Sequence, residues 1–224
     1  MTLSNTLFAN QFIGILGGTF DPVHYGHLRS AQAVIQTLNL HRLLLMPCGE
    51  PAHRAPPIAN AAQRLHMLQL ACLEFPQMQI DERELTRVGA SYTFDSLQEL
   101  THDYPGAQLC LVMGQDAFAH FPTWHRAVDI LQLTYIIVMA RPNYRLDPQS
   151  LADEWYQQHG LSIQQFKELR TRKAGAIIFL ETPEYAISST AIRAYLNAGE
   201  SLPDHWLPPT VGQWLATNNI YQSF

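Results

Sequence analysis

Short apolar runs recur along the chain, and they constrain its fold more than any other feature. They lie at residues 12–16, 42–46, 78–81, 108–113, 135–139 and 176–180. Several are apolar throughout instead of alternating with polar residues, which is typical of strands covered on both faces. The runs therefore predict strands buried inside a layered protein.

Segments with helical spacing separate these runs. The helices are predicted at residues 26–38, 61–74, 94–101, 124–131, 151–158, 189–197 and 208–218. In the segment 61–74, Leu65, Leu68 and Cys72 are expected to form one buried stripe. Alternating strands and helices predict an α/β fold, a Rossmann-like doubly wound and mostly parallel sheet with helices on both faces. We expect one domain over residues 1–224, with a helical C-terminal portion from about residue 181.

The charge balance excludes some ligand classes. Charged residues make up 15% of the chain and the net charge is −5, which argues against general binding of nucleic acid. An anionic ligand must then be held by local positive features. Only Lys167 and Lys173 supply lysine, so phosphate contacts earlier in the chain must come from arginine, histidine or backbone N–H groups.

The cysteines and the apolar runs indicate the cellular compartment of the protein. Cys48, Cys72 and Cys110 are widely spaced, which favours free thiols in a reducing compartment. The longest apolar run, near residues 135–140, is too short to cross a bilayer, and residues 1–11 have no basic start. The sequence predicts a soluble, cytoplasmic protein without a membrane partner.

A glycine-rich turn, GGTFDPVHYGHL at residues 17–28, follows the first apolar run. Such a turn between a first strand and a first helix generally binds phosphate. The dinucleotide fingerprint fails, because the glycines stand at positions 14, 17 and 18. The P-loop also fails, because the turn contains no lysine. His24 and His27 remain, with His27 at or next to the start of the helix, where an imidazole can donate to a phosphate oxygen.

Two other interpretations of these histidines stay open at this point. They are consistent with one loop residue and one residue of a capped helix start. They are also consistent with half of a zinc site, although His24 and His27 lack obvious further ligands.

A second stretch, AISSTAIR at residues 186–193, has the same kind of chemistry. Ser188, Ser189 and Thr190 stand where a helix would be capped, and their hydroxyls would lie beside free N–H groups. Arg193 follows Ser189 by four residues and is expected on the same helical face. Together they predict a second anion site, whereas the alternative is an ordinary N-cap with a surface arginine.

The two stretches together resemble the nucleotidyltransferase superfamily with an H-x-G-H signature. G-G-T-F-D-P-x-H-x-G-H is matched in full at residues 17–27, and a late [IS]-S-[ST]-x-[IL]-R motif is matched within ISSTAIR at residues 187–193. PAHRAPP at 51–57, SYTFDSL at 91–97, MGQDAFAHFPTWHR at 113–126 and ARPNY at 140–144 are similar to the bacterial nicotinate-mononucleotide adenylyltransferase family. The resemblance covers nearly the whole chain, from about Phe12 onward.

This resemblance implies an enzyme that transfers the adenylyl group of ATP, with Mg²⁺ bound through phosphates, to nicotinate mononucleotide in NAD biosynthesis. It implies catalytic roles for His24, His27 and Arg193. The implied ATP-binding residues are Gly17, Gly18, Thr19, Phe20, Ser188, Ser189 and Thr190.

The resemblance also implies an acceptor site. Its expected residues are His53, Arg54, Tyr92, Thr93, Gly114, Asp116, Trp124 and Arg141. Trp124 would stack on the nicotinate ring, and Tyr92 and Thr93 would donate to its carboxylate. Asp116 would accept from ribose hydroxyls, and Arg54 and Arg141 would bind the acceptor phosphate; many members have lysine at the position of Arg54.

Each acceptor residue has a structural alternative. Trp124 is consistent with a core residue, Asp116 and Thr93 with helix caps, and Arg141 with a solvated loop charge. The rival functions are adenylyl transfer to nicotinamide mononucleotide or pantetheine phosphate, and non-catalytic nucleotide sensing. The sequence leaves the oligomeric state open, with a homo-oligomer among the options.

Overall fold

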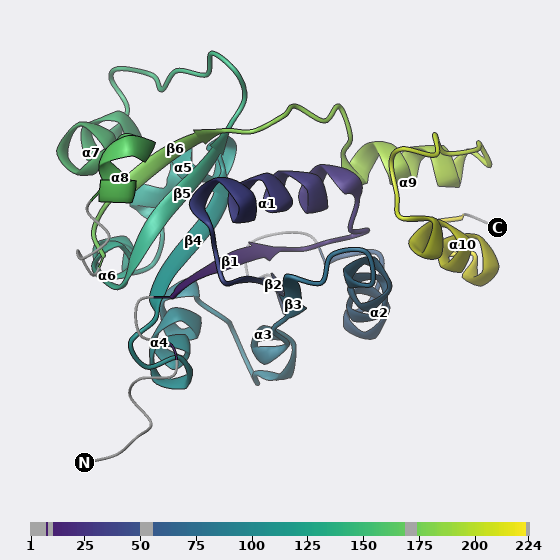
Figure 1. The fold of residues 1–224 in the computed structure, drawn as a ribbon. Helices are drawn as coiled ribbons and strands as arrows, with labels where there is room; N and C mark the ends of the chain where they lie inside the picture. The colour runs from purple at the N-terminus through teal and green to yellow at the C-terminus, as the bar shows by residue number, and fades with distance from the viewer. Residues whose placement is uncertain (1–7, 9–10, 50–55, 169–173, 223–224) are drawn as a thin grey trace. The chain divides into compact units, whose positions relative to one another are not determined.

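Six strands form one parallel sheet in the order β3-β2-β1-β4-β5-β6 (Figure 1). The computed structural model describes residue 8 and residues 11–49, 56–168 and 174–222. The strands are β1 (Phe12–Gly18), β2 (Arg42–Pro47), β3 (Met78–Ile80), β4 (Gln108–Gly114), β5 (Thr134–Ala140) and β6 (Ile177–Glu181). Every predicted strand is present, with ends that shift by no more than a residue or two.

The strand order explains the doubly wound prediction. From β1 the chain adds β2 and β3 on one side, and then returns to add β4, β5 and β6 on the other. Because parallel crossovers are right-handed, this reversal places helices on opposite faces of the sheet. The predicted α/β, Rossmann-like fold is confirmed.

The chain divides into two compact units. The first comprises Met1–Leu16, Ala33–Leu43 and Tyr92–Pro183, and the second comprises Gly17–Gln32, Leu44–Ser91 and Glu184–Phe224. The expectation of one domain with a helical C-terminal portion stays a prediction.

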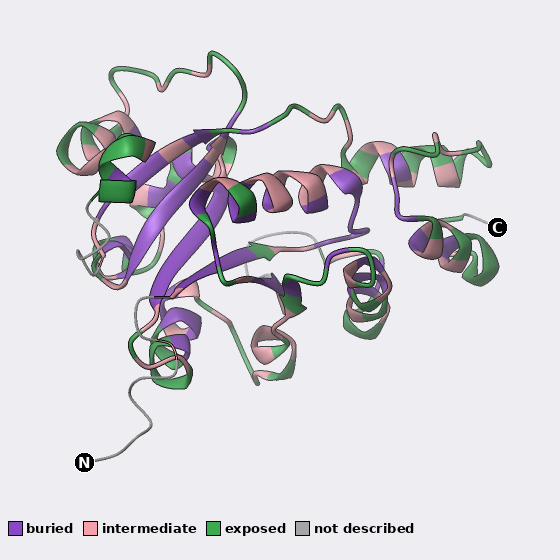
Figure 2. Ribbon diagram, viewed as in Figure 1, coloured by how far each residue is buried: buried purple, intermediate pink, exposed green. Residues whose placement is uncertain are grey.

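The first unit contains the pairings of β4 with β1 and with β5, and of β5 with β6. In register, Ile13 lies opposite Leu109, Leu111 opposite Ile136, and Ile137 opposite Ile178. Strands β4 and β5 are almost wholly buried (Figure 2), as expected of strands that are apolar on both faces. The helices of this unit are α4 (Thr93–Asp103), α5 (Gln115–His120), the 3₁₀ helix η2 (Phe121–Thr123), α6 (Ala127–Leu133), α7 (Leu151–His159) and α8 (Ile163–Glu168).

The predicted helix at residues 124–131 was wrong at its start. Residues Phe121–Thr123 form η2, Trp124 is extended, and Arg126 has a left-handed φ of 58°. Helix α6 therefore begins only at Ala127. The structure also has α3 (Arg83–Thr86), α5 and α8, which were not predicted, since four to six residues are too few to show a helical period.

The second unit contains the glycine-rich turn and the C-terminal helices. Its helices are the start of α1 (Tyr25–Leu38), α2 (Ala61–Cys72), α3, α9 (Ser189–Asn197) and α10 (Pro209–Asn218). Helix α10 packs on α2, where the Thr210 hydroxyl donates to the Leu70 carbonyl at 3.3 Å and the rings of His66 and Trp214 lie 5.1 Å apart.

The predicted buried stripe of α2 was only partly correct. Leu68 is buried, but Leu65 and Cys72 are only half-buried, and the buried face is completed by Arg64, Met67 and Ala71. Arg64 is 2% exposed because its Nη1 donates to the Thr19 carbonyl at 2.9 Å. A charged residue that binds the turn is thus part of the buried face, which the hydrophobic pattern had assigned to Leu65, Leu68 and Cys72.

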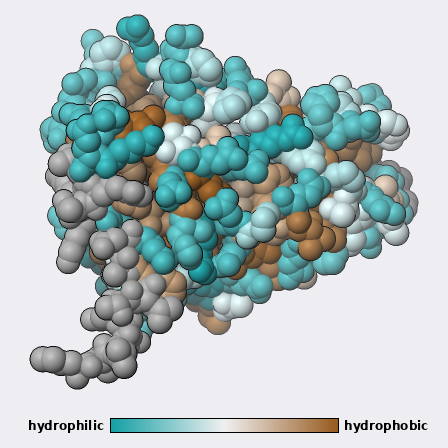
Figure 3. All heavy atoms as spheres, in the orientation of Figure 1, coloured by the Kyte–Doolittle hydropathy of each residue, from teal (hydrophilic) through white to brown (hydrophobic). Residues whose placement is uncertain are grey.

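The face of the protein in Figure 3 is largely hydrophilic, with apolar residues scattered between polar ones. Within the part of the chain that the structure describes, no helix is long and apolar enough to span a bilayer. The three cysteines are all free thiols, as predicted.

Candidate active site

The turn that follows β1 brings both histidines to the start of α1. Strand β1 ends at Gly18, and α1 begins at Tyr25. The His24 carbonyl accepts the first helical hydrogen bonds, from His27 N at 2.9 Å and from Leu28 N at 3.2 Å. His27 therefore stands in the first helical turn, as the sequence predicted.

The two imidazoles are stacked against each other. Their ring centroids lie 3.7 Å apart at an angle of 25°, and His24 is only 5% exposed. Burial and, to a lesser extent, the neighbouring His27 lower the pKa of His24 to about 2. Burial also lowers the pKa of His27 to about 4. Both rings are therefore neutral at neutral pH, and each has one N–H to donate.

One ring nitrogen of each imidazole also lacks a hydrogen-bond partner among the described residues. The Nδ1 atoms of His24 and His27 are buried and have no hydrogen-bond partner among the described residues. A buried polar atom without a partner is costly, and such atoms in a native protein call for an explanation. A ligand that bonds to the imidazoles would provide one.

Gly26 allows the two rings to stack. A Cβ atom at this position would lie 2.8 Å from His24 Nδ1 and 2.9 Å from its Cε1. It would also lie 3.5 Å from the carbonyl oxygen of Ile187. The glycine between the histidines is thus required by close packing, which gives the H-x-G-H spacing a physical reason.

Phe20 shapes the turn itself. It has a left-handed φ of 51°, a conformation that an aromatic residue rarely adopts. Its ring is buried, lies 5.2 Å from the His27 ring, and fills the space where a Cβ on Gly18 would come within 3.0 Å. Gly18 and Phe20 therefore depend on each other, and the turn places Phe20 beside His27.

The late motif forms the start of α9. The Ser188 hydroxyl caps the helix by accepting from Ala191 N at 3.1 Å, as the sequence predicted. The Ser189 hydroxyl donates to the Pro22 carbonyl at 3.0 Å, which ties α9 to the glycine-rich turn. Arg193 Nη2 donates to Thr190 Oγ1 at 3.3 Å.

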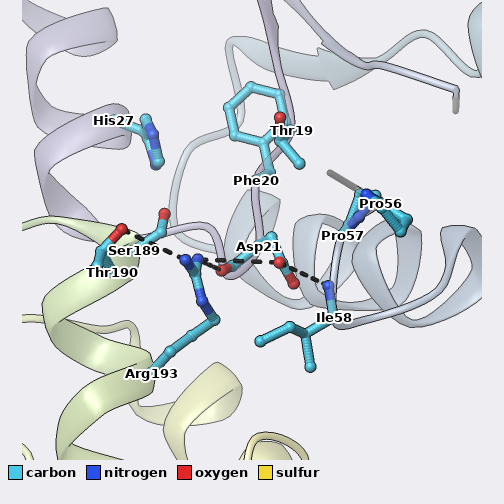
Figure 4. Close-up of a pocket in the computed structure, with 10 residues that line it drawn as sticks. All are labelled: Thr19, Phe20, Asp21, His27, Pro56, Pro57, Ile58, Ser189, Thr190 and Arg193. Carbon is cyan, nitrogen blue, oxygen red and sulfur yellow. Dashed lines mark hydrogen bonds and ion pairs between the residues drawn. The ribbon is translucent and has the colours of Figure 1, made fainter. Parts of the chain in front are cut away.

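A cavity of about 570 Å³ lies within the second unit, where these elements meet (Figure 4). His27 reaches it from α1, and Ser189, Thr190 and Arg193 reach it from α9. Its lining is completed by Thr19, Phe20, Asp21, Pro56, Pro57 and Ile58. The first turns of both helices face the cavity, and their N–H groups and dipoles favour an anion.

The structure separates the predicted ATP-binding residues into two sets. Thr19, Phe20, Ser189 and Thr190 line the cavity, together with His27 and Arg193. The other predicted ATP-binding residues, Gly17, Gly18 and Ser188, do not line it, and neither does His24, which was predicted to be catalytic. His24 instead stacks on His27, and Ser188 caps α9.

The sequence analysis missed Asp21, which lines the cavity, and Tyr221, which contacts Asp21. Asp21 is 5% exposed and accepts from the backbone N–H groups of Ile58 and Ala59 at 2.9 and 3.0 Å. Tyr221 donates to the same carboxylate at 2.7 Å. The position of Asp21 inside the matched motif was a signal for a role, but nothing in the sequence connects it with Tyr221, 200 positions away.

The predicted acceptor residues that the structure describes belong to the first unit. Tyr92 is the N-cap residue of α4, and its ring lies 4.5 Å from that of His125. Thr93 is the first residue of α4, so the alternative of Thr93 as the cap is wrong. Gly114 ends β4 and is the N-cap residue of α5, so Asp116 is not a cap either.

Asp116, Trp124 and Arg141 are accessible to different degrees. The Asp116 side chain is exposed in the first turn of α5. Burial raises the pKa of Tyr144, and the nearby Asp116 carboxylate raises it further. Trp124 is half-buried against Phe121, at 5.5 Å between ring centroids, so it is not a fully buried core residue. Arg141 is exposed, and its backbone N–H donates to the Gln115 side chain at 2.9 Å. His53 and Arg54 lie outside the described residues.

The donor set of the cavity bears on metal binding. Within the described ranges, no group of three or more histidine, cysteine or acidic side chains is placed to hold a metal ion. Asp21, the one carboxylate among the described residues that line the cavity, already accepts from three donors. These residues fit a divalent ion that arrives with phosphate and water ligands.

Comparison with known proteins places the chain among nucleotidyltransferases. The model of the cytidylyltransferase-like family matches residues 15–195. The chain is 42% identical to the "Probable nicotinate-nucleotide adenylyltransferase" of Klebsiella pneumoniae (strain 342), over 94% of this chain and 97% of that protein. It is 40% identical to the nicotinate-nucleotide adenylyltransferase of Salmonella typhimurium, over 93% of this chain and 97% of the relative.

Solved structures agree on the fold. The nicotinic acid mononucleotide adenylyltransferase of Plasmodium falciparum, complexed with NaAD, matches with a TM-score of 0.69 and covers 94% of this chain and 97% of its own. Its sequence identity is 17%, so this likeness concerns the fold alone.

Proposed function

Since the chain belongs to the nicotinate-nucleotide adenylyltransferase family, we propose that it transfers the adenylyl group of ATP to nicotinate mononucleotide. The products are nicotinate adenine dinucleotide and pyrophosphate, and the reaction is a step of NAD biosynthesis. The observation that carries this proposal is the cavity in which His27, Ser189, Thr190 and Arg193 meet at the N-termini of two helices.

The cavity binds the triphosphate of ATP through complementary donors. The Arg193 guanidinium supplies the positive charge, and the Thr190 hydroxyl and the N–H groups at the start of α9 supply neutral donors. This composition suits a ligand with several phosphate oxygens, because the lining residues that the structure describes offer many donors and a single carboxylate. Thr19 and Phe20 line the same cavity, next to His27.

The transfer needs no general base, because the acceptor phosphate is already an anion. One of its oxygens forms a bond to the α-phosphorus of ATP, in line with the bond from that phosphorus to the bridging oxygen, which breaks. The electron pair of the broken bond leaves with pyrophosphate. Catalysis then consists of positioning the reactants and stabilising the charge of the leaving group.

The histidines contribute to that stabilisation as neutral hydrogen-bond donors. Since the pKa of His27 is lowered to about 4, its ring reaches the phosphates without a positive charge. A donor held in place where negative charge develops is more effective than water, because it need not reorient during the reaction. His24 supports the His27 ring by stacking on it at 3.7 Å.

The acceptor site uses residues of the first unit. Trp124 presents part of its ring to solvent, which suits stacking on nicotinate, and Tyr92 is also exposed. Asp116 offers an exposed carboxylate for ribose hydroxyls, near the end of β4. The proposed acceptor set also includes Gly114, Thr93 and Arg141. It is completed by His53 and Arg54, which are assigned from the sequence alone.

A divalent ion accompanies ATP in this reaction. Members of the nucleotidyltransferase family generally use one, and we propose Mg²⁺ held mainly by the phosphates and by water. When bound, it neutralises charge on the triphosphate. Mg²⁺ prefers oxygen ligands, and the hydroxyls of Thr19 and Thr190 offer neutral oxygens at the cavity.

The proposed partners are ATP and nicotinate mononucleotide, without nucleic acid, and the proposed compartment is the cytoplasm. The free thiols of Cys48, Cys72 and Cys110 support a reducing compartment. The number of subunits stays open.

The release of pyrophosphate tests the proposed function. The enzyme is incubated with ATP and Mg²⁺ and with nicotinate mononucleotide, nicotinamide mononucleotide, pantetheine phosphate or no acceptor. We expect release that depends on the acid mononucleotide. Release with the amide or pantetheine phosphate alone would overturn the proposed acceptor, and ATP binding without release under any condition would indicate a nucleotide sensor.

A further inference from the structure

Asp21 is a buried carboxylate with an unusual set of partners. Its Oδ2 atom accepts from Ile58 N at 2.9 Å, and its Oδ1 atom accepts from Ala59 N at 3.0 Å and from the Tyr221 hydroxyl at 2.7 Å. All three donors are neutral. These donors replace the water that a carboxylate loses on burial, and none of the three carries a positive charge.

Arg193 lies beside this carboxylate but is not locked to it. Its Nη1 atom donates to the backbone carbonyl of Asp21 at 2.7 Å, while the distance from Nη1 to Oδ2 is 3.8 Å (Figure 4). A bidentate pair with Asp21 would occupy two N–H groups of the guanidinium. The observed arrangement keeps the guanidinium at the cavity, with Nη2 directed to Thr190.

Tyr221 holds its place by burial and by backbone conformation. It is 7% exposed and has a left-handed φ of 72°. Burial and the bond to Asp21 both raise its pKa, so the phenol stays protonated and remains a donor. It does not line the cavity, and its contact with the site runs through Asp21.

We propose that Tyr221 is a positioning residue for ATP, acting through Asp21 on Arg193. By donating to Oδ1, Tyr221 completes the neutral donor set of Asp21, which leaves the Arg193 guanidinium available to the triphosphate. Without the hydroxyl, the carboxylate would have fewer donors and would attract the guanidinium more strongly, away from ATP. This inference rests on the proposed binding of ATP in the cavity, and it gives the last described residues a role in that binding.

The test variant is Tyr221→Phe, which keeps the ring and removes only the hydroxyl. The dissociation constant of a non-hydrolysable ATP analogue with Mg²⁺ is measured by titration calorimetry without acceptor, well below the unfolding midpoint of the variant. We expect the dissociation constant, and the KM for ATP, to rise at least about fivefold. The KM for nicotinate mononucleotide should change less than about twofold.

Tyr195→Phe is the matched control. Tyr195 stands on α9, as Arg193 does, but its ring packs on Trp206 at 5.1 Å and it does not line the cavity. This variant should leave ATP binding unchanged. An equal loss in Tyr195→Phe and Tyr221→Phe would overturn the proposal, because it would indicate general loosening of the C-terminal region.

A double-mutant cycle tests whether Tyr221 acts through Arg193. In an Arg193→Ala background, Tyr221→Phe should change the dissociation constant less than about twofold, since the group that it positions is gone. A full effect in that background would overturn the proposal, as would an unchanged dissociation constant in the single variant. Binding is measured without acceptor, so it tests the role of Tyr221 even in an enzyme that transfers no adenylyl group. The absence of transfer would contradict the proposed function alone.

Discussion

At the scale of single residues, the site depends on close packing around two neutral imidazoles. His24 and His27 stack at 3.7 Å, and Gly26 is the residue that permits this, because any Cβ there would lie 2.8 Å from His24 Nδ1. His24 is buried, so its ring has little space into which it can move. A methyl group at position 26 must therefore disturb the histidine pair.

This packing predicts the effect of Gly26→Ala. Displacing His24 removes the support of the His27 ring, so kcat should fall by about tenfold or more. The matched control is Gly212→Ala in α10, where a Cβ meets nothing within 4 Å. Steady-state rates of the two variants, compared with their thermal midpoints, provide the measurement. A Gly26→Ala enzyme with normal kcat would contradict the required stacking.

At the scale of elements, α9 carries both a structural and a binding role. Ser188 caps the helix and does not line the cavity, whereas Ser189, Thr190 and Arg193 line it. The sequence analysis assigned all four to ATP or catalysis, because a cap and an anion site use the same residue types. Only the placement of each hydroxyl separates the two roles.

Substitution of Ser188 tests this separation. Ser188→Ala should lower the free energy of unfolding by roughly 1 kcal/mol, the usual effect of losing an N-cap, while Ser188→Thr should restore most of it. The dissociation constant of the ATP analogue should change little in either variant. Urea unfolding and analogue titration are the two measurements. Unchanged stability with weakened binding in Ser188→Ala would contradict the capping role and favour direct contact with ATP.

The elements also show what the sequence could predict. Runs such as residues 108–113 are apolar throughout, so their strands and the sheet were predictable from burial alone. Helices α3, α5 and α8 have four to six residues, too few for a period to appear. The start of α6 was missed because Arg126 adopts a left-handed φ, which an arginine in a sequence does not predict.

At the scale of the whole molecule, the glycine-rich turn and the late motif indicated an anion site because both combine helix starts with donor side chains. Their meeting at one cavity follows from the fold, since 162 positions separate Ser189 from His27. The contact between Tyr221 and Asp21 could not be predicted, because a single hydroxyl on a carboxylate has no sequence pattern. Tertiary packing alone brings such pairs together.

The central claim is that His27 stabilises the leaving pyrophosphate in adenylyl transfer to nicotinate mononucleotide. The most direct test follows label from α-labelled ATP into nicotinate adenine dinucleotide, in a single turnover with saturating Mg²⁺ and acceptor. Wild type and His27→Ala are compared, with His102→Ala, an exposed histidine of α4, as the control. We predict labelled dinucleotide from wild type and from the control, and a rate at least about a hundredfold lower in His27→Ala. A His27→Ala enzyme as fast as wild type, or no labelled dinucleotide from folded wild type that binds ATP, would contradict the account.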